Sequence, residues 1–155
     1  MLTEIKNLSK KTKMLLGIVF VASTVAIVVL ARETIDGNRY LYSEGIVAMN
    51  QKQYDKAALI FAKALKRNPS DCGSRFGLAW AYQMKGQLPQ STPQYREMIS
   101  NCESLLVFAY ANFGLILQAS SNDREAKAFY TKALTLDPSN KLIHERLSAF
   151  TPKKK

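Results

Sequence analysis

Residues 107–140, VFAYANFGLILQASSNDREAKAFYTKALTLDPSN, decide the fold. The stretch begins with an apolar helical pattern, continues through a polar turn at residues 120–123, and ends with a second helical pattern that Pro138 terminates. Small residues on both helices allow an antiparallel pair to approach closely, and larger residues fill the gaps between them. The small residues are Gly114, Ala126 and Ala133, and the larger ones are Tyr130 and Leu134. The stretch therefore predicts a helical hairpin.

The same spacing recurs earlier in the chain. From Gly114, small, aromatic, small and proline positions follow after 12, 16, 19 and 24 residues, and the same steps from Gly45 reach the same residue classes. The matching residues are Ala57, Phe61, Ala64 and Pro69, against Ala126, Tyr130, Ala133 and Pro138. Gly45 and Gly114 lie 69 residues apart, which equals two periods of about 34 residues and one inserted residue. The recurrence indicates an internal repeat.

This pattern resembles the tetratricopeptide repeat family, whose unit is a helix–turn–helix of about 34 residues with small and aromatic residues at fixed positions. The resemblance implies an all-α array of three antiparallel helical hairpins, at residues 38–71, 72–105 and 107–140.

A further amphipathic helix is expected at residues 141–150, because a stacked array needs a cap over its last apolar face. The inward residues are expected to be Leu142, Ile143, Leu147 and Phe150, and the outward ones Lys141, Glu145 and Arg146. Residues 151–155 form a basic tail.

The second helix of the middle repeat departs from the pattern. The positions that hold alanine, an aromatic residue, alanine and proline elsewhere are Ser91, Tyr95, Met98 and Glu103. Proline breaks a helix interior but is tolerated in a first turn. Because of Pro89 and Pro93, we expect a loop from Gly86 to Thr92, with Thr92 as the N-cap of a shortened helix. The enlarged loop is either a contact site or a product of neutral drift.

Residues 14–31, MLLGIVFVASTVAIVVLA, contain no charged side chain and follow a basic flank at residues 1–13. Eighteen helical residues rise about 27 Å, close to the roughly 30 Å of a bilayer's hydrocarbon core. The stretch predicts a transmembrane helix, which a linker at residues 32–37 joins to the repeats, with a hinge at Asp36-Gly37-Asn38. A cleaved signal peptide is one alternative, although its apolar region usually spans about 7–15 residues. A helix buried in a soluble protein is another.

Lysine and arginine near the two ends of this stretch indicate its orientation. Four lysines precede it, whereas Arg32 and Arg39 follow it within a similar distance. The positive-inside rule places the N-terminus in the cytoplasm and the repeats in a periplasm or an equivalent compartment. A cytoplasmic or stromal repeat domain is an alternative, as is a domain secreted after signal cleavage.

The two cysteines, Cys72 and Cys102, bracket the middle repeat. In an antiparallel hairpin, the start of the first helix and the end of the second are neighbours. A disulfide between them would need an oxidising compartment, which agrees with the predicted orientation. Two unpaired thiols are the alternative.

Several classes of function lack support in the sequence. There is no nucleophile–base pair, no glycine-rich phosphate loop and no pair of carboxylates in an apolar setting. Two cysteines and His144, which we expect at the surface, lack metal-ligand spacing. The net charge of +10 arises mostly at the two ends, and no basic stripe with interleaved aromatic residues points to nucleic acid. We expect no enzyme activity, cofactor, metal or small-molecule substrate.

The resemblance implies binding, because in this family the first helices of successive repeats line a groove that holds a partner peptide or helix. On this sequence the groove-facing residues would be Arg39, Tyr42, Ile46, Met49 and Asn50, then Phe76, Trp80, Gln83 and Met84, then Phe108, Ala111, Leu115 and Gln118. Most are apolar or aromatic, which suits an apolar segment. In the alternative interpretation, Trp80 and its neighbours are simply core.

Members that clamp the acidic tails of heat-shock chaperones use Lys, Asn and Arg in this groove. Several of the corresponding positions here hold Tyr42, Ile46, Gly77 and Phe108. The sequence therefore does not support chaperone-tail binding.

The sequence thus predicts a membrane-tethered protein–protein interaction module. Some membrane-tethered members of this family help assemble respiratory, photosynthetic or cytochrome complexes, or act beside the secretion channel. An assembly factor or scaffold for a membrane protein complex of this kind is the function that the resemblance implies. A permanent accessory subunit of such a complex is the alternative.

Overall fold

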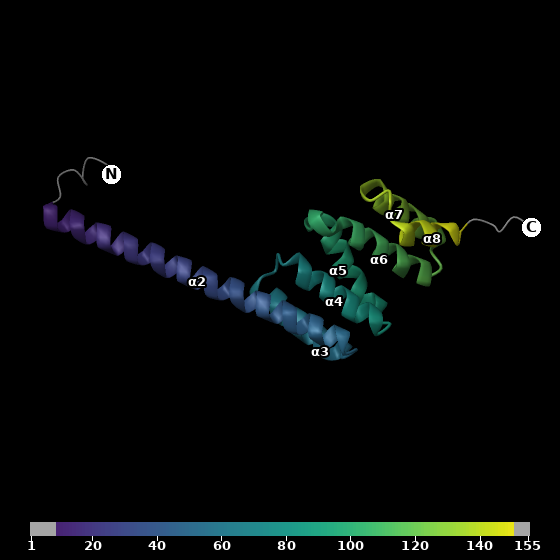
Figure 1. Ribbon diagram of the computed structural model, residues 1–155, viewed down its shortest axis with the longest axis horizontal. Coiled ribbons are helices and arrows are strands. Elements are labelled where there is room, and N and C mark those ends of the chain that lie inside the picture. The colour runs from purple at the N-terminus through teal and green to yellow at the C-terminus, as the bar shows by residue number, and fades with distance from the viewer. Residues whose placement is uncertain (1–8, 151–155) are drawn as a thin grey trace, which may run out of the picture. The chain divides into compact units, whose positions relative to one another are not determined.

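The computed structural model describes residues 9–150, without the side chains of residues 31 and 33–35, and every regular element in that range is helical (Figure 1). The chain forms two compact units, Met1–Arg39 and Tyr40–Lys155. The helices are α2 (Lys10–Asn50), α3 (Tyr54–Arg67), α4 (Cys72–Met84), α5 (Leu88–Asn101), the short 3₁₀ helix η1 (Glu103–Leu105), α6 (Leu106–Ala119), α7 (Asp123–Leu136) and α8 (Lys141–Ser148). The expected all-α fold is confirmed.

The first unit contains the apolar part of α2. Ser9 precedes the helix, and its hydroxyl accepts a hydrogen bond from the Thr12 amide at 3.2 Å. Further along, the Ser23 and Thr24 hydroxyls donate to carbonyls three residues back, so neither polar group interrupts the helix. Residues 10–30 are long and apolar enough to cross a membrane, a criterion that a signal sequence also meets.

The linker expected at residues 32–37 is helical and forms part of α2, which extends from Lys10 to Asn50. Gly37 costs a helix interior only about 1 kcal/mol relative to alanine. One glycine flanked by residues that tolerate helix therefore weakens the helix locally without ending it.

The second unit stacks antiparallel hairpins. Helix α3 packs against α4, α4 against α5, α5 against α6, α6 against α7, and α7 against α8 (Figure 1). Three hydrophobic cores follow one another along the unit. The first core centres on Phe61, the second on Tyr95 and Met98, and the third on Tyr130. The three large residues at the repeated aromatic position thus each anchor one core.

Glycine explains how these aromatic rings fit. A Cβ atom built on Gly114 would lie 3.0 Å from the Tyr130 ring. Around Phe61 the fit is closer on two sides, since a Cβ on Gly45 would lie 2.5 Å from the ring and one on Gly77 2.4 Å from it. Gly45 and Gly114 are therefore contact surfaces for the aromatic residue of the following helix, and Gly77 is one for Phe61 of the preceding helix.

The middle hairpin corrects the expectation of a shortened helix. Helix α5 spans Leu88–Asn101, with Pro89 in its first turn and Pro93 inside it. Pro93 removes one backbone hydrogen bond, but three residues of the same helix are fully buried. They are Ser91, Tyr95 and Met98. The Ser91 hydroxyl donates to the Ala79 carbonyl at 2.8 Å, so the buried serine is satisfied in the position of the usual alanine. Burial of one face thus outweighs the local cost of proline.

Candidate binding groove

The predicted groove residues lie on the first helix of each hairpin, but the structure exposes them to different degrees. The exposed residues are Arg39, which ends the first unit, and Tyr42, Asn50, Met84 and Phe108. Those of intermediate exposure are Ile46, Phe76, Trp80, Gln83, Ala111, Leu115 and Gln118. Met49 is buried at 5% exposure. Most of the predicted surface on α4 and α6 is therefore at least partly accessible.

Met49 was predicted to face the groove, but it belongs to the first core together with Phe61. The equivalent positions in the next two hairpins are Gln83 and Gln118. There the Tyr95 hydroxyl donates to Gln83 Oε1 at 2.8 Å and the Tyr130 hydroxyl donates to Gln118 Oε1 at 3.0 Å. In the first hairpin phenylalanine and methionine share one core, whereas in the others tyrosine donates a hydrogen bond to glutamine. The residue type at this position therefore matches its aromatic neighbour: apolar methionine beside phenylalanine, and hydrogen-bonding glutamine beside tyrosine.

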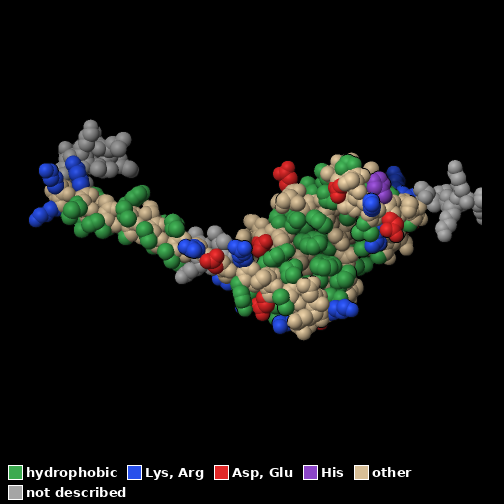
Figure 2. All heavy atoms as spheres, viewed as in Figure 1, with side chains coloured by type: hydrophobic (Ala, Val, Ile, Leu, Met, Phe, Trp, Pro, Cys, Tyr) green, Lys and Arg blue, Asp and Glu red, His purple; other side chains and the backbone are tan. Residues whose placement is uncertain are grey.

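An aromatic surface joins the second and third hairpins. The rings of Phe76 and Trp80 on α4 are stacked, with centroids 6.0 Å apart, and Phe76 lies 5.9 Å from Phe108 of α6. Phe108 is 55% exposed, and Trp80 packs partly against the first core. Figure 2 shows hydrophobic side chains gathered over the middle of the repeat unit, with charged side chains towards its edges. We call Phe76, Trp80 and Phe108 the aromatic surface.

A pocket of about 130 Å³ lies between α6 and α8. Its lining includes the predicted groove residues Phe108, Ala111 and Leu115, and it adds Asn112, Leu142 and Arg146. These last three residues were not among the predicted groove residues.

Two of these residues correct the expected faces of the capping helix. Leu142 was expected inward but is 60% exposed, and Arg146 was expected outward but is partly buried. Helix α8 has only eight residues, and Ile143 is its one buried residue. An eight-residue helix completes little more than two turns, so a periodic pattern fixes its orientation poorly. The missed signal was the Asn140 side chain, which caps α8 at the Ile143 amide and sets where the helix begins.

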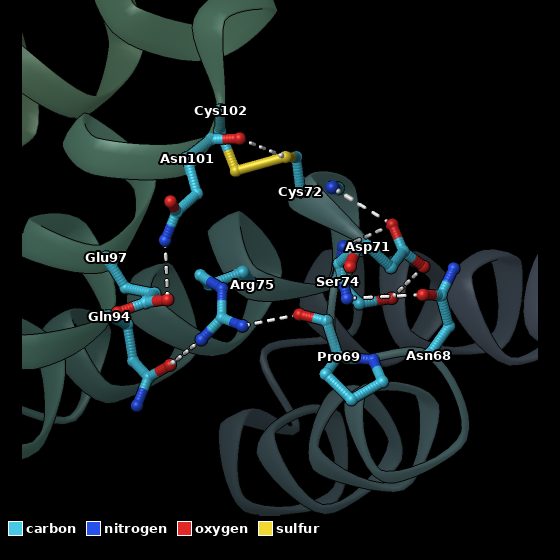
Figure 3. The surroundings of a disulfide bond; sticks show 12 residues. Asn68, Pro69, Asp71, Cys72, Ser74, Arg75, Gln94, Glu97, Asn101 and Cys102 are labelled. Atoms are coloured by element: carbon cyan, nitrogen blue, oxygen red, sulfur yellow. Dashed lines mark hydrogen bonds between the residues drawn. A yellow bond between two sulfur atoms is a disulfide. The ribbon is translucent and has the colours of Figure 1, made fainter.

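Cys72 and Cys102 form a disulfide, with Cα atoms 5.7 Å apart (Figure 3). Cys72 begins α4 and Cys102 caps the end of α5, so the bond joins the open ends of the middle hairpin. Asp71 caps α4 by accepting hydrogen bonds from the Gly73 and Ser74 amides at 3.1 and 3.2 Å. The start of α4 is therefore held both covalently and by its cap.

The Tyr95 phenol gives the repeat unit a dependence on alkaline pH. Burial raises the pKa of Tyr95 above its ordinary value near 10. Below pH 10 the phenol is neutral in both folded and unfolded chains, so its effect is constant. Above pH 10 the unfolded chain loses this proton while the folded chain keeps it, so we expect stability to fall as pH rises.

The measurement is the urea midpoint of the full-length protein in nonionic detergent from pH 8 to 11. Tyr95→Phe is expected to lose less stability over this range than the wild type. Tyr40→Phe, which changes a tyrosine that is 66% exposed, is expected to behave like the wild type. Identical pH profiles for all three proteins would refute the assignment to Tyr95.

Antiparallel hairpins stacked in series, with a small residue facing an aromatic residue in each, define an α-helical repeat protein. The model of the tetratricopeptide repeat matches residues 39–71 and again residues 109–140. Both of these stretches of the chain are therefore tetratricopeptide repeats.

One curated relative is the small glutamine-rich tetratricopeptide repeat-containing protein 2 of Mycosarcoma maydis, which is 29% identical over 109 residues. That alignment covers 70% of this chain and 31% of the relative, so this chain spans about a third of the relative's length.

Two solved structures share the fold. The TPR domain of Arabidopsis OM64 has a TM-score of 0.68 and 22% identity, covering 76% of this chain and 99% of that domain. The first TPR of Spaghetti (RPAP3), solved with the HSP90 peptide SRMEEVD, has the same score and identity and covers 72% and 88%. Domains of this family mediate protein–protein interactions.

Proposed function

We propose that the protein is a membrane-tethered interaction module that captures an apolar segment of a partner protein and helps to assemble or hold a membrane protein complex. The observation that carries this proposal is the aromatic surface, which extends across two hairpins. Aromatic side chains at the centre of an interface supply much of its binding energy. None of the predicted groove residues in the second unit is charged.

The lack of charged side chains among the predicted groove residues of the second unit indicates what kind of partner segment suits them. The RPAP3 structure holds a peptide with three acidic residues. An acidic tail needs cations to replace the water that it loses, and the predicted groove residues on α4 and α6 are aromatic, aliphatic or amide side chains. An uncharged apolar segment fits them better.

The proposed tether is the apolar part of α2, whose side chains are exposed over residues 14–30. Such a row of exposed apolar side chains in water would be unfavourable, whereas lipid would cover it. Figure 2 shows lysine side chains at its start. We propose an N-terminus in the cytoplasm and repeats across the membrane, following the lysine bias.

The test is site-specific photocrosslinking of the full-length protein in its native membranes. A photoreactive phenylalanine analogue at Met84, which is 43% exposed on α4, is expected to crosslink one recurrent partner. The analogue at Leu59, which is 73% exposed on α3, provides the matched control and is expected not to crosslink that partner.

Trp80→Ala is expected to reduce the Met84 crosslink at least about tenfold, because losing a central aromatic residue costs about 2 kcal/mol or more at an interface. Helicity and the urea midpoint of Trp80→Ala serve as the folding control. An unchanged crosslink in a folded variant would contradict the proposal. Unfolding of Trp80→Ala would place Trp80 in the core, and Phe108→Ala, at an exposed position, then carries the same test of capture.

The molar ratio of this protein to its identified partner distinguishes an assembly factor from an accessory subunit. Substoichiometric, transient association with the identified partner supports assembly. A constant equimolar ratio after gentle-detergent purification supports a permanent subunit.

A further inference from the structure

The disulfide lies in the hairpin that carries most of the aromatic surface. Phe76 and Trp80 are on α4 of the middle hairpin, and Phe108 is on α6 of the next one. The chain has two cysteines, and this bond uses both of them. The bond therefore restrains the hairpin that supplies two of the three aromatic side chains.

On one side, a single helical turn connects the bond to Phe76. Cys72 is the first residue of α4 and Phe76 follows four residues later, so the two side chains lie on the same face of the helix. Both are partly buried and pack against the second core. A movement of Cys72 relative to that core therefore moves Phe76 as well.

On the other side, the bond leads to Phe108. The Cys102 carbonyl accepts a hydrogen bond from the Leu105 amide at 3.1 Å in η1, and α6 begins at the next residue. Cys102 is 3% exposed and belongs to the second core together with Ala109, the residue after Phe108. The bond thus ties the start of α4 to the segment that positions Phe108, whose ring lies 5.9 Å from that of Phe76.

A hydrogen bond beside the disulfide also links α4 to α5. The Arg75 guanidinium donates to Gln94 Oε1 at 3.3 Å and to the Pro69 carbonyl at 2.5 Å (Figure 3). The bond to Gln94 is longer than the usual range of about 2.7–3.2 Å. Without the disulfide, the middle hairpin keeps its buried core around Tyr95, but its open end is held less firmly.

We propose that the Cys72–Cys102 bond preorganises the aromatic surface, so that reduction of the bond weakens capture of the partner while the repeat unit stays folded. The inference rests on the proposed capture function and adds its regulation by redox state. Affinity falls when binding has to order groups that move in the free protein. In the oxidised protein Phe76 is held in place before the partner arrives, whereas in the reduced protein the partner has to order the start of α4.

The reductant is a dithiol, and the accessible sulfur decides where it attacks. Cys72 is partly exposed and Cys102 is buried, so a thiolate of the dithiol attacks Cys72 Sγ. The S–S bond breaks, and its electron pair goes to Cys102 Sγ, which takes a proton. The second thiolate of the reductant then displaces Cys72 Sγ from the mixed disulfide, and Cys72 takes a proton. Two thiols form on the chain, and the dithiol leaves as a disulfide.

The first test measures capture with the Met84 photocrosslink in native membranes, with and without dithiothreitol. Dithiothreitol is expected to lower the crosslink of the wild type at least about fivefold, the lower end of the usual coupling between linked sites. Cys72→Ala/Cys102→Ala is expected to show the low yield of the reduced wild type under both conditions. A high yield in the double variant without reductant would place the effect of dithiothreitol on the partner and would overturn the inference.

The second test needs no partner, because Trp80 is the one tryptophan of the chain and its ring stacks on Phe76. Reduction of the full-length protein in nonionic detergent is expected to shift the Trp80 emission to longer wavelength and to increase its quenching by acrylamide. Circular dichroism is expected to show unchanged helicity. A stabilising bond that does not position Phe76 would leave the emission of the folded protein unchanged.

Ile143→Ala is the control for a general loss of stability. Ile143 is 2% exposed in the third core, whose described members all lie after η1, so its loss leaves a cavity away from α4. This variant is expected to keep both the Met84 crosslink and the Trp80 emission of the oxidised wild type. A crosslink that falls as much in Ile143→Ala as on reduction would overturn the inference.

Two further outcomes would also overturn it. One is an undiminished crosslink in wild type whose two thiols are shown to be free by alkylation after denaturation. The other is loss of helicity over the same range of reductant as loss of the crosslink, since capture would then depend on folding alone. A Met84 crosslink that forms in the oxidised protein and survives reduction leaves the interaction module standing and removes only its redox control.

Discussion

Replacing Phe61 by alanine is expected to lower the free energy of unfolding of the repeat unit by about 3–5 kcal/mol. The ring is fully buried in the first core, which also includes Leu41, Ala57 and Leu78. These residues come from α2, α3 and α4, so the ring joins the first hairpin to the second. The expected loss compares with a total stability of about 5–15 kcal/mol for a typical domain.

The glycines around Phe61 are the reason for the upper part of this range. The loss of stability rises with the volume of the cavity that the neighbouring atoms fail to refill. Gly45 and Gly77 face the ring from two helices and have no side chain that can move into the space. The cavity left by Phe61→Ala is therefore bordered by backbone, which relaxes only by moving whole helices.

Urea unfolding of the full-length protein in nonionic detergent, followed by circular dichroism, measures the effect. Leu59→Ala on the same helix is the matched control, since Leu59 is 73% exposed and its loss is expected to change stability by less than about 0.5 kcal/mol. Similar losses in both variants would show that Phe61 does not anchor the core.

The spacing of glycine, alanine and aromatic residues was sufficient to predict the hairpins, because each small residue has one partner at a fixed separation. Gly114 with Tyr130 and Gly45 with Phe61 are direct contacts in the structure. Gly77 has no counterpart in that spacing, and its contact with Phe61 comes from the neighbouring hairpin. Contacts within a repeat were therefore readable from the sequence, whereas contacts between repeats were not.

The wrong expectation for α5 came from treating proline as decisive. Pro93 costs one hydrogen bond and some steric strain, but the same helix buries Tyr95 and Met98 completely. Tertiary packing outweighed a local penalty that is visible in the sequence. For the pocket, the sequence pattern was insufficient. Arg146 lies on a short helix, where periodicity carries little information about which side chains face inward.

Removing the Cys72–Cys102 disulfide is expected to lower the free energy of unfolding by about 3–4 kcal/mol. The bond closes a loop with a sequence separation of 30 residues, and the chain-entropy model gives about this value for such a loop. The loop contains the whole middle hairpin, including the α5 helix that Pro93 weakens. Cys102 is 3% exposed and lies in the second core, so the bond fixes the end of α5 within that core.

The test compares the wild type with Cys72→Ala/Cys102→Ala, each with and without dithiothreitol. Reductant is expected to lower the urea midpoint of the wild type towards that of the double variant and to leave the double variant unchanged. A reductant effect of equal size on both proteins would attribute it to something other than this bond.

The same bond tests the proposed compartment, because a disulfide persists where the surroundings are oxidising. In whole cells, alkylation by a thiol reagent is expected to leave both cysteines unmodified until a reductant is added after denaturation. Thiols that are alkylated after denaturation without reductant would place the repeats in a reducing compartment and would contradict the proposed orientation. The protein would then have to fold without the 3–4 kcal/mol that the bond contributes, so the urea midpoint of the double variant also measures whether the unit tolerates that compartment.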